Sequence, residues 1–145
     1  MRAAPRSIRG AVNPLSVLLL TGIAVAIYCV VIFAPPYLDH IDVMDAVGSA
    51  YNQTGVRDDS VVERDLKDRL IHSIGTHREQ NEEGELVEVR GLGVADEDVT
   101  FEVNRPEKTV HIEVRYVREV RLKPSSRWTK LRFTAKKTGV PAGLK

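Results

Sequence analysis

The sequence predicts an α+β fold: an N-terminal transmembrane helix, then two amphipathic helices packed on a three- to four-stranded antiparallel β-meander. Three observations predict it: an uncharged apolar run near the N-terminus, apolar residues at helical spacing after it, and alternating apolar residues in the last third of the chain. We therefore expect a cytoplasmic basic N-terminus (residues 1–14), a transmembrane helix (15–34), an extracytoplasmic α+β domain (35–137) and a flexible tail (138–145).

The membrane span is predicted by residues 15–34, which number twenty and carry no charge. At a rise of about 1.5 Å per residue, such a helix covers the ~30 Å hydrocarbon core of a bilayer. Three arginines precede this run and three aspartates follow it: Arg2, Arg6, Arg9, Asp39, Asp42 and Asp45. Because cationic flanks stay in the cytoplasm, we expect a single-pass membrane protein with its N-terminus inside and its C-terminal domain outside the cytoplasm.

Cys29 is the single cysteine of the chain, and it lies inside the apolar run. The exported domain is therefore expected to fold without a disulfide, as is common in bacterial envelopes. A cleaved signal peptide is the alternative interpretation of the same run. The only A-x-A sequence, Ala24-Val25-Ala26, lies in its middle, and cleavage after Ala34 would place Pro35 directly after the bond. Both facts favour a retained anchor.

Gly22 and Ala26 form a small-xxx-small pair within the predicted span. Small residues allow helices to approach closely in lipid, so these two are candidate helix-packing positions for a membrane-protein partner or a homo-oligomer. The alternative is that they occur there by chance, because small residues are common in such spans.

Two amphipathic helices are predicted after the span, at residues 37–52 and 61–74, from apolar residues that recur every three or four positions. The pair Pro35-Pro36 is expected to end or kink the preceding helix, because proline lacks the N–H that a helix needs. Residues 76–85 are polar and acidic, and are expected to form a solvated loop.

Strands are predicted at residues 86–89 and in three alternating segments after them. Turns at 105–108 and 123–126 give an antiparallel register that places one apolar face on three successive strands. The expected pairs are Val103 with Val110, Phe101 with Ile112, Val99 with Val114, Tyr116 with Phe133, and Val114 with Ala135. Arg118 alone breaks the apolar row of its strand.

Charge is distributed unevenly along the predicted domain. Residues 58–99 hold 13 acidic and 5 basic residues, whereas residues 100–145 hold 12 basic and 4 acidic residues. Opposite potentials attract, so the two halves are expected to pack against each other. The polar sheet face is also a candidate surface for an anionic partner, through Arg115, Arg121, Trp128, Lys130 and Arg132.

Anionic lipid headgroups, a cell-wall polymer or an acidic protein fit this basic face better than nucleic acid does, because the expected compartment lies outside the cytoplasm. The alternative is a solvated face with interspersed glutamates. No small-molecule substrate is expected.

The sequence offers no recognisable catalytic or metal motif. The four histidines lack metal-ligand spacing, and no cysteine outside the span joins them: His40, His72, His77 and His111. There is no G-x-S-x-G elbow and no phosphate-binding glycine fingerprint followed by a helix. We therefore expect a protein that is not an enzyme and has no catalytic residues, cofactor or metal.

The layout resembles a family of small proteobacterial inner-membrane proteins of unknown function. The matching residues are Pro36-Tyr37-Leu38-Asp39, the helix through Val47, Val114-Arg115-Tyr116 and Leu131-Arg132-Phe133. The sequence departs from that family at Arg9-Gly10-Ala11, where members often have a glycine-leucine or glycine-serine pair. The resemblance implies an N-terminal anchor and a periplasmic α+β domain, without active-site residues.

The resulting hypothesis is an extracytoplasmic interaction or structural protein, an accessory of a membrane or envelope complex, with the lipid bilayer as its first partner. Two alternatives stay open. One is a pilin-like (pseudopilin) assembly subunit, because type IV pilins also join an apolar helix to an α+β head; here Leu15 stands where pilins usually carry glutamate. The other is an envelope binder of anionic lipid or wall polymer.

Overall fold

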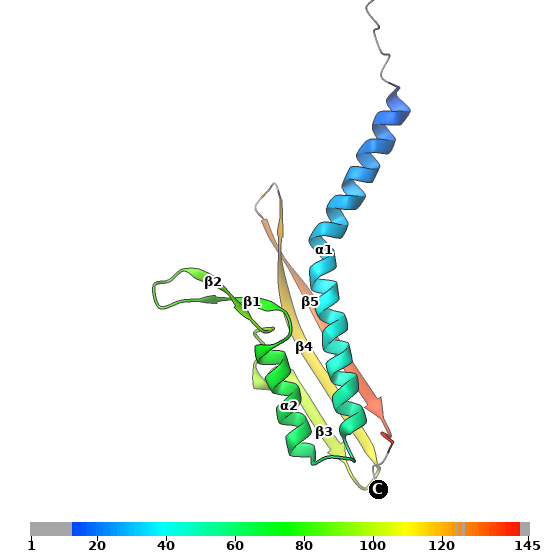
Figure 1. The fold of residues 1–145 in the computed structure, drawn as a ribbon, viewed down its shortest axis with the longest axis vertical. Coiled ribbons are helices and arrows are strands. Elements are labelled where there is room, and N and C mark those ends of the chain that lie inside the picture. The colour runs from blue at the N-terminus through cyan, green and yellow to red at the C-terminus, as the bar shows by residue number, and fades with distance from the viewer. Residues whose placement is uncertain (1–12, 124, 126, 143–145) are drawn as a thin grey trace, which may run out of the picture. The chain divides into compact units, whose positions relative to one another are not determined.

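The computed structural model describes residues 13–123, 125 and 127–142 of the 145-residue chain. The fold is α+β, as predicted, with two helices and two antiparallel sheets (Figure 1). Its elements are α1 (Pro14–Gln53), α2 (Asp59–His72), β1 (Thr76–Gln80), β2 (Leu86–Arg90), η1 (Asp96–Asp98), β3 (Val99–Asn104), β4 (Thr109–Leu122) and β5 (Arg127–Gly139). The chain divides into two compact units, Met1–Val31 and Ile32–Lys145, which are described separately.

The first unit holds most of the apolar part of α1. An 18-residue window of this helix has a mean hydropathy of 2.8, and none of it is buried. By length and composition α1 is the one helix among the described residues that is suited to cross a membrane.

The helix does not end at the proline pair. Pro35 and Pro36 both lie inside α1, so the expected helix at residues 37–52 is the C-terminal part of α1. The prediction of a separate helix was wrong, and the described chain has two helices where three were expected. Each proline removes one N–H from the ladder, but its φ near −65° is itself helical, which allows the backbone to continue.

Helix α2 begins and ends two residues before its predicted bounds of 61–74. Asp58 caps its N-terminus, because its carboxylate accepts a hydrogen bond from the backbone N–H of Ser60 at 2.9 Å. A hydrogen bond from the Ser60 hydroxyl, together with this backbone bond, holds the pKa of Asp58 below its usual value.

The core lies between the two helices and one face of the three-stranded sheet (Figure 1). Its largest fully buried aliphatic side chains come from α1, α2 and β4: Val43, Val47, Val62, Leu66, Leu70, Val110, Ile112 and Val114. Each such side chain contributes roughly 1.5–3 kcal/mol when it leaves water. The C-terminal part of α1 is therefore a core element of the second unit.

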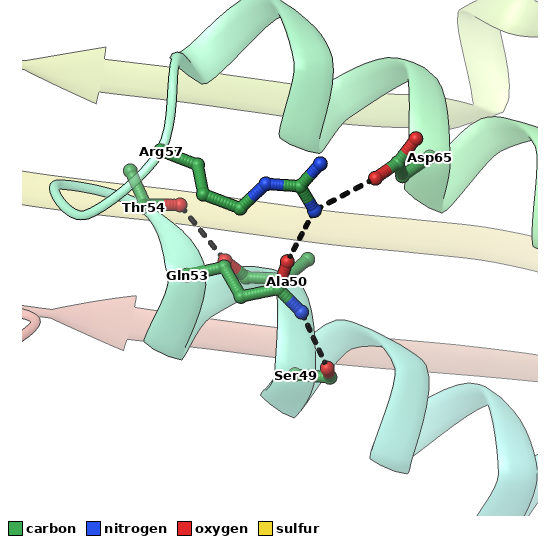
Figure 2. Close-up of polar contacts among 6 residues, drawn as sticks. All are labelled: Ser49, Ala50, Gln53, Thr54, Arg57 and Asp65. Atoms are coloured by element: carbon green, nitrogen blue, oxygen red, sulfur yellow. Dashed lines mark hydrogen bonds and ion pairs between the residues drawn. The ribbon is translucent and has the colours of Figure 1, made fainter.

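A buried corner joins α1 to α2 (Figure 2). Thr54 is completely buried, and its hydroxyl donates to the carbonyl of Ala50 at 2.9 Å. Figure 2 shows the guanidinium of Arg57 between the two helices, where it donates to Gln53 of α1 and to Asp65 of α2, both at 2.9 Å. The corner therefore satisfies its polar groups while it fixes the two helices against each other.

The predicted register of the sheet is confirmed at every pair. The structure pairs Val103 with Val110, Phe101 with Ile112, Val99 with Val114, Tyr116 with Phe133, and Val114 with Ala135. The strand order is β3-β4-β5. Strand β5 continues through Thr138 and Gly139, which pair with His111 and Val110. The expected flexible tail at 138–145 therefore begins too early, because these two residues complete the ladder of β4.

The first half of the acidic loop predicted at residues 76–85 forms a strand. Residues Thr76–Gln80 form β1 and pair with β2, from Thr76 opposite Arg90 to Gln80 opposite Leu86. Apolar alternation fails to mark β1 because its residues are polar and neither face of the hairpin is deeply buried. The side chain of Asn81 holds the turn by accepting from the backbone N–H of Glu85 at 2.8 Å.

A close backbone contact joins the end of this hairpin to α2. The N–H of Leu92 donates to the carbonyl of Leu70 at 3.0 Å, and the N–H of Gly91 donates to Gly75 at 2.9 Å. Gly91 has a φ of 104°, and a Cβ at this position would lie 1.7 Å from the carbonyl oxygen of Ile71. Only glycine fits this approach.

Gly91→Ala is therefore expected to destabilise the domain by about 3 kcal/mol or more, because it adds steric overlap to an unfavourable φ. The matched control is Gly84→Ala, whose φ is 82° but whose Cβ would meet no atom closer than 3.6 Å. That change is expected to cost only about 1 kcal/mol. Denaturant unfolding of the full chain in detergent micelles, followed by circular dichroism, measures both. Equal losses in the two variants would show that the Ile71 contact is unimportant.

Candidate functional site

The predicted basic face exists as a geometric surface. The register places Arg121 opposite Trp128, Lys130 opposite Glu119, and Arg132 opposite Val117. Because side chains alternate along a strand, these residues and Arg115 project from the sheet face that is turned away from the core. The sequence prediction therefore identified residues that lie on one face.

Part of this face is neutralised locally. The guanidinium of Arg115 donates to Glu113 at 2.5 Å, and this hydrogen bond holds the pKa of Glu113 below its usual value. Lys130 lies 3.5 Å from Glu119 across the strands. Beyond Glu119 the sequence contains no acidic residue. The positive charge therefore becomes less balanced toward the turn between β4 and β5.

Trp128 lies between two arginines. The guanidinium carbon of Arg78 is 3.3 Å from the centroid of its ring, and that of Arg121 is 5.9 Å away. Arg78 belongs to β1, so this cation–π contact holds the base of the hairpin against β5. Sequence reasoning missed Arg78 because the segment was expected to be a loop.

A cavity of about 440 Å³ lies beside this contact, between the base of the hairpin and strands β4 and β5. Its lining is mixed in charge and includes Arg78, Glu88, Arg118, Glu119 and Trp128. The described residues include no group of three or more His, Cys, Asp or Glu side chains arranged to hold a metal ion.

A second cluster joins the start of the second unit's helical segment to the sheet. The carboxylate of Asp39 forms an ion pair with Arg118, and both side chains are mostly buried, at 21% and 13% exposure. His40 Nδ1 lies 3.0 Å from the hydroxyl oxygen of Tyr116. Burial raises the pKa of Tyr116 above its ordinary value, and the nearby Asp39 carboxylate adds to this shift. The phenol therefore stays neutral at physiological pH.

Phe133 is the aromatic centre of this helix–sheet cluster. Its ring lies 5.4 Å from that of Tyr37 in an edge arrangement, 4.9 Å from that of His40, and 5.5 Å from that of Tyr116 in a stacked arrangement. Such pairs contribute roughly 0.5–1.5 kcal/mol each beyond simple burial. The sequence did not predict this cluster. Its one sign there is Arg118, which interrupts the apolar row because its side chain pairs with Asp39.

A groove of about 760 Å³ runs between α1 and the outer side of β5. It is lined by Met44 and Gly48 of α1 and by Lys136 and Lys137 of β5, among others. The Lys137 ammonium nitrogen also lies 4.9 Å from the ring of Tyr51. The groove is therefore open, amphipathic and positively charged on its strand side.

Gly22 and Ala26 lie in the first unit, on an exposed stretch of α1. They line an apolar hollow of about 570 Å³ together with Leu15, Leu18, Leu19 and Ile23. A Cβ built at Gly22 would meet no atom within 4 Å. The two residues that were singled out as helix-packing positions therefore share one open apolar surface.

Comparisons with protein families, curated proteins and solved structures found no match to this chain. The class of the protein is therefore defined by its own geometry: an α+β domain built on a helix that is suited by length and composition to cross a membrane.

Asp39→Asn is expected to destabilise the domain by about 3 kcal/mol, because it leaves the buried guanidinium of Arg118 without a counter-charge. The double variant Asp39→Leu with Arg118→Met removes both charges and is expected to recover most of this loss. Arg64→Met on the exposed side of α2 serves as the control, with an expected change under about 0.5 kcal/mol. Denaturant unfolding in micelles measures all three. If the double variant has a lower free energy of unfolding than Asp39→Asn, the ion-pair argument is contradicted.

Arg78→Ala is expected to loosen the hairpin, because it removes the contact with Trp128 that is worth about 0.5–1 kcal/mol. Hydrogen exchange of residues 76–90 is expected to accelerate, while exchange in β4 stays unchanged. The matched control is Arg90→Ala, which removes a charge from the same hairpin and leaves the Arg78 contact in place. Equal acceleration in both variants would assign the effect to charge alone.

Proposed function

We propose that this chain is a membrane-anchored extracytoplasmic interaction protein, an accessory of a membrane or envelope complex. In this proposal the apolar part of α1 crosses a bacterial inner membrane once, with the N-terminus in the cytoplasm and the domain in the periplasm. The observation that carries it is the apolar window of α1, none of which is buried. In water, each Å² of such surface costs roughly 25 cal/mol, and lipid removes that cost.

Retention of the span, rather than cleavage, is supported by the helix that follows it. Residues 32–53 continue α1 without a break, and Val43, Val47 and Ala50 of this segment are buried in the core. A peptidase cleaves extended backbone, whereas the region after Ala34 is helical. The basic flank before the span and the acidic flank after it support the orientation.

A non-enzymatic role is supported by how the reactive side chains are used. Asp39 is paired with Arg118, and His40 is bonded to Tyr116. His111 lies 2.6 Å from the hydroxyl of Thr138, and His77 lies 3.1 Å from the carbonyl oxygen of Gly91. These groups hold elements together, whereas the basic face and the groove beside β5 offer surfaces for contact.

A pilin-like assembly subunit is the second candidate. The observation that favours it is one continuous helix whose first part is apolar and exposed and whose second part packs on a sheet. This alternative predicts removal of the first ten residues by a prepilin peptidase. Intact mass of the protein purified from its membrane decides it, because the proposed accessory protein keeps its N-terminus.

Cell fractionation is expected to place the chain in the membrane, where it resists alkaline washing and is released by detergent. Protease added to the periplasmic side of spheroplasts is expected to digest the C-terminal domain and leave a fragment that contains the apolar helix. A cytoplasmic tag placed before Met1 serves as the control and stays intact. Recovery of the protein in the soluble fraction, or a protected domain, would overturn the proposal.

Photo-crosslinking is expected to identify the partner. Probes at Leu19 in the apolar hollow and at Met44 in the groove report on the span and the domain separately. Gly22→Leu with Ala26→Leu is expected to abolish the Leu19 crosslink, since large side chains prevent close helix approach. The matched control is Val17→Leu with Val25→Leu. A crosslink that forms a dimer of the chain itself would assign the partner as a second copy.

A further inference from the structure

The C-terminal part of α1 and the β4–β5 ribbon run side by side in the second unit. Tyr51 lies beside Gly139, His40 is bonded to Tyr116, and Tyr37 touches Phe133. From Tyr51 back to Tyr37 the helix advances about 21 Å. From Gly139 back to Phe133 the strand advances about 20 Å. The ribbon and the helix therefore advance by nearly equal distances toward Ala34, where the apolar run ends.

The ribbon then continues farther than that residue. From Tyr37 to Ala34, the last residue of the apolar run, α1 advances only about 4.5 Å. From Phe133 to Arg127, β5 advances about 20 Å in the same direction. Figure 1 shows β4 and β5 extending beyond the end of β3, so this part of the ribbon is a two-stranded projection. Within the second unit, the end of the ribbon therefore extends farther in this direction than Ala34 does.

This end of the ribbon carries positive charge and one large aromatic. We define the basic tip as Arg121, Lys123, Arg127, Trp128 and Lys130. No acidic residue lies between Val120 and the C-terminus. Lys123 and Arg127 are exposed, and Trp128 is 41% exposed. Basic residues beside a tryptophan are the combination that membrane–water interfaces favour.

We propose that the basic tip binds anionic phospholipid headgroups of the membrane that holds α1, and so docks the domain on the bilayer surface. This inference rests on the proposed membrane anchoring. The lysine and arginine side chains pair with headgroup phosphates, and Trp128, with Arg78 over one face of its ring, lies at the interface. Because charged residues stay out of the hydrocarbon, the tip stops in the headgroup layer and fixes the inclination of the domain.

The rival occupant for these charges is an acidic surface of another protein. The lipid is favoured because, in the proposed function, the same chain enters the bilayer at Ala34, three residues before Tyr37, whose ring contacts Phe133 of the ribbon. Association within one molecule needs no encounter in solution, so a few weak contacts are sufficient. Each basic residue at an anionic surface contributes about a fivefold factor in binding.

Fluorescence of the full chain in nanodiscs tests the proposal, because Trp128 is the only tryptophan. Discs of phosphatidylcholine are compared with discs of equimolar phosphatidylcholine and phosphatidylglycerol, each with a nitroxide on a fraction of the headgroups. We expect strong quenching of Trp128 in the anionic discs, reduced by salt and weaker in neutral discs. Inorganic phosphate at matched ionic strength is expected to leave the quenching unchanged, which distinguishes a lipid headgroup from free phosphate.

The decisive variant is Lys123→Gln with Arg127→Gln and Lys130→Gln, which keeps Trp128 and its two arginine neighbours. Because Lys130 is already paired with Glu119, the other two charges decide the effect, and at about fivefold each we expect the ratio of docked to undocked domain to fall by roughly 25-fold. The matched control removes the same three charges elsewhere: Arg64→Gln, Lys108→Gln and Lys136→Gln. Quenching that is equal in both triple variants would overturn the proposal.

The two proposals fail in different ways. A chain that does not co-migrate with nanodiscs during size-exclusion chromatography contradicts the anchor itself. A chain that co-migrates but whose Trp128 is untouched by headgroup nitroxides contradicts only the docking of the tip. A partner protein that crosslinks to a probe at Lys123 in native membranes, with no quenching in protein-free discs, would assign the tip to an acidic protein instead.

Discussion

The packing of α1 on the sheet is the constraint on which the rest of the structure depends. One helix face, with Val43 and Val47, covers the apolar row of β4 that includes Val110 and Ile112. Without this face the sheet would expose its core to water, because α2 covers only part of it. The domain therefore needs the C-terminal part of α1 to fold. The helix that is proposed to anchor the chain is thus also a structural element of the domain, so cleavage within residues 37–50 would remove part of the core.

The ion pair of Asp39 with Arg118 fixes the position of α1 along the sheet. Apolar contacts between a helix and a sheet tolerate sliding, since they depend mainly on buried area. A buried charge pair does not, because displacement of one partner leaves the other uncompensated. The pair lies next to the aromatic contacts of Phe133, close to the end of the apolar run. Within the second unit, the position of this part of α1 on the β4–β5 ribbon is therefore held by a charge pair as well as by buried apolar area.

The sequence predicted the sheet better than the helices and the hairpin. The predicted register was correct because side chains alternate between the two faces of a strand. In each of three successive strands the apolar residues occupy alternate positions, so a slip of one residue would have exposed the core. The predicted end of the first helix was wrong because the proline rule is local, whereas the helix is held by burial of Pro36 and of Val43 beyond it. Strand β1 was missed because its residues face solvent. The basic face could be read from residue parity, but its contact with Arg78 depended on the missed strand.

The acidic and basic halves of the domain only partly neutralise each other. Arg105 and Asp59 form one bridge between them at 2.6 Å, and Arg78 meets the basic face through an aromatic ring rather than through a carboxylate. Glu82, Glu83 and Glu85 are exposed at the hairpin turn. Lys123 and Arg127 are exposed at the end of the β4–β5 ribbon. The domain therefore has a separated charge distribution. Near an anionic surface such a distribution is attracted at the ribbon and repelled at the hairpin turn, and both effects favour the same orientation. The net charge of the chain is only +1, yet the separation of acidic and basic residues within the domain orients it at a charged surface.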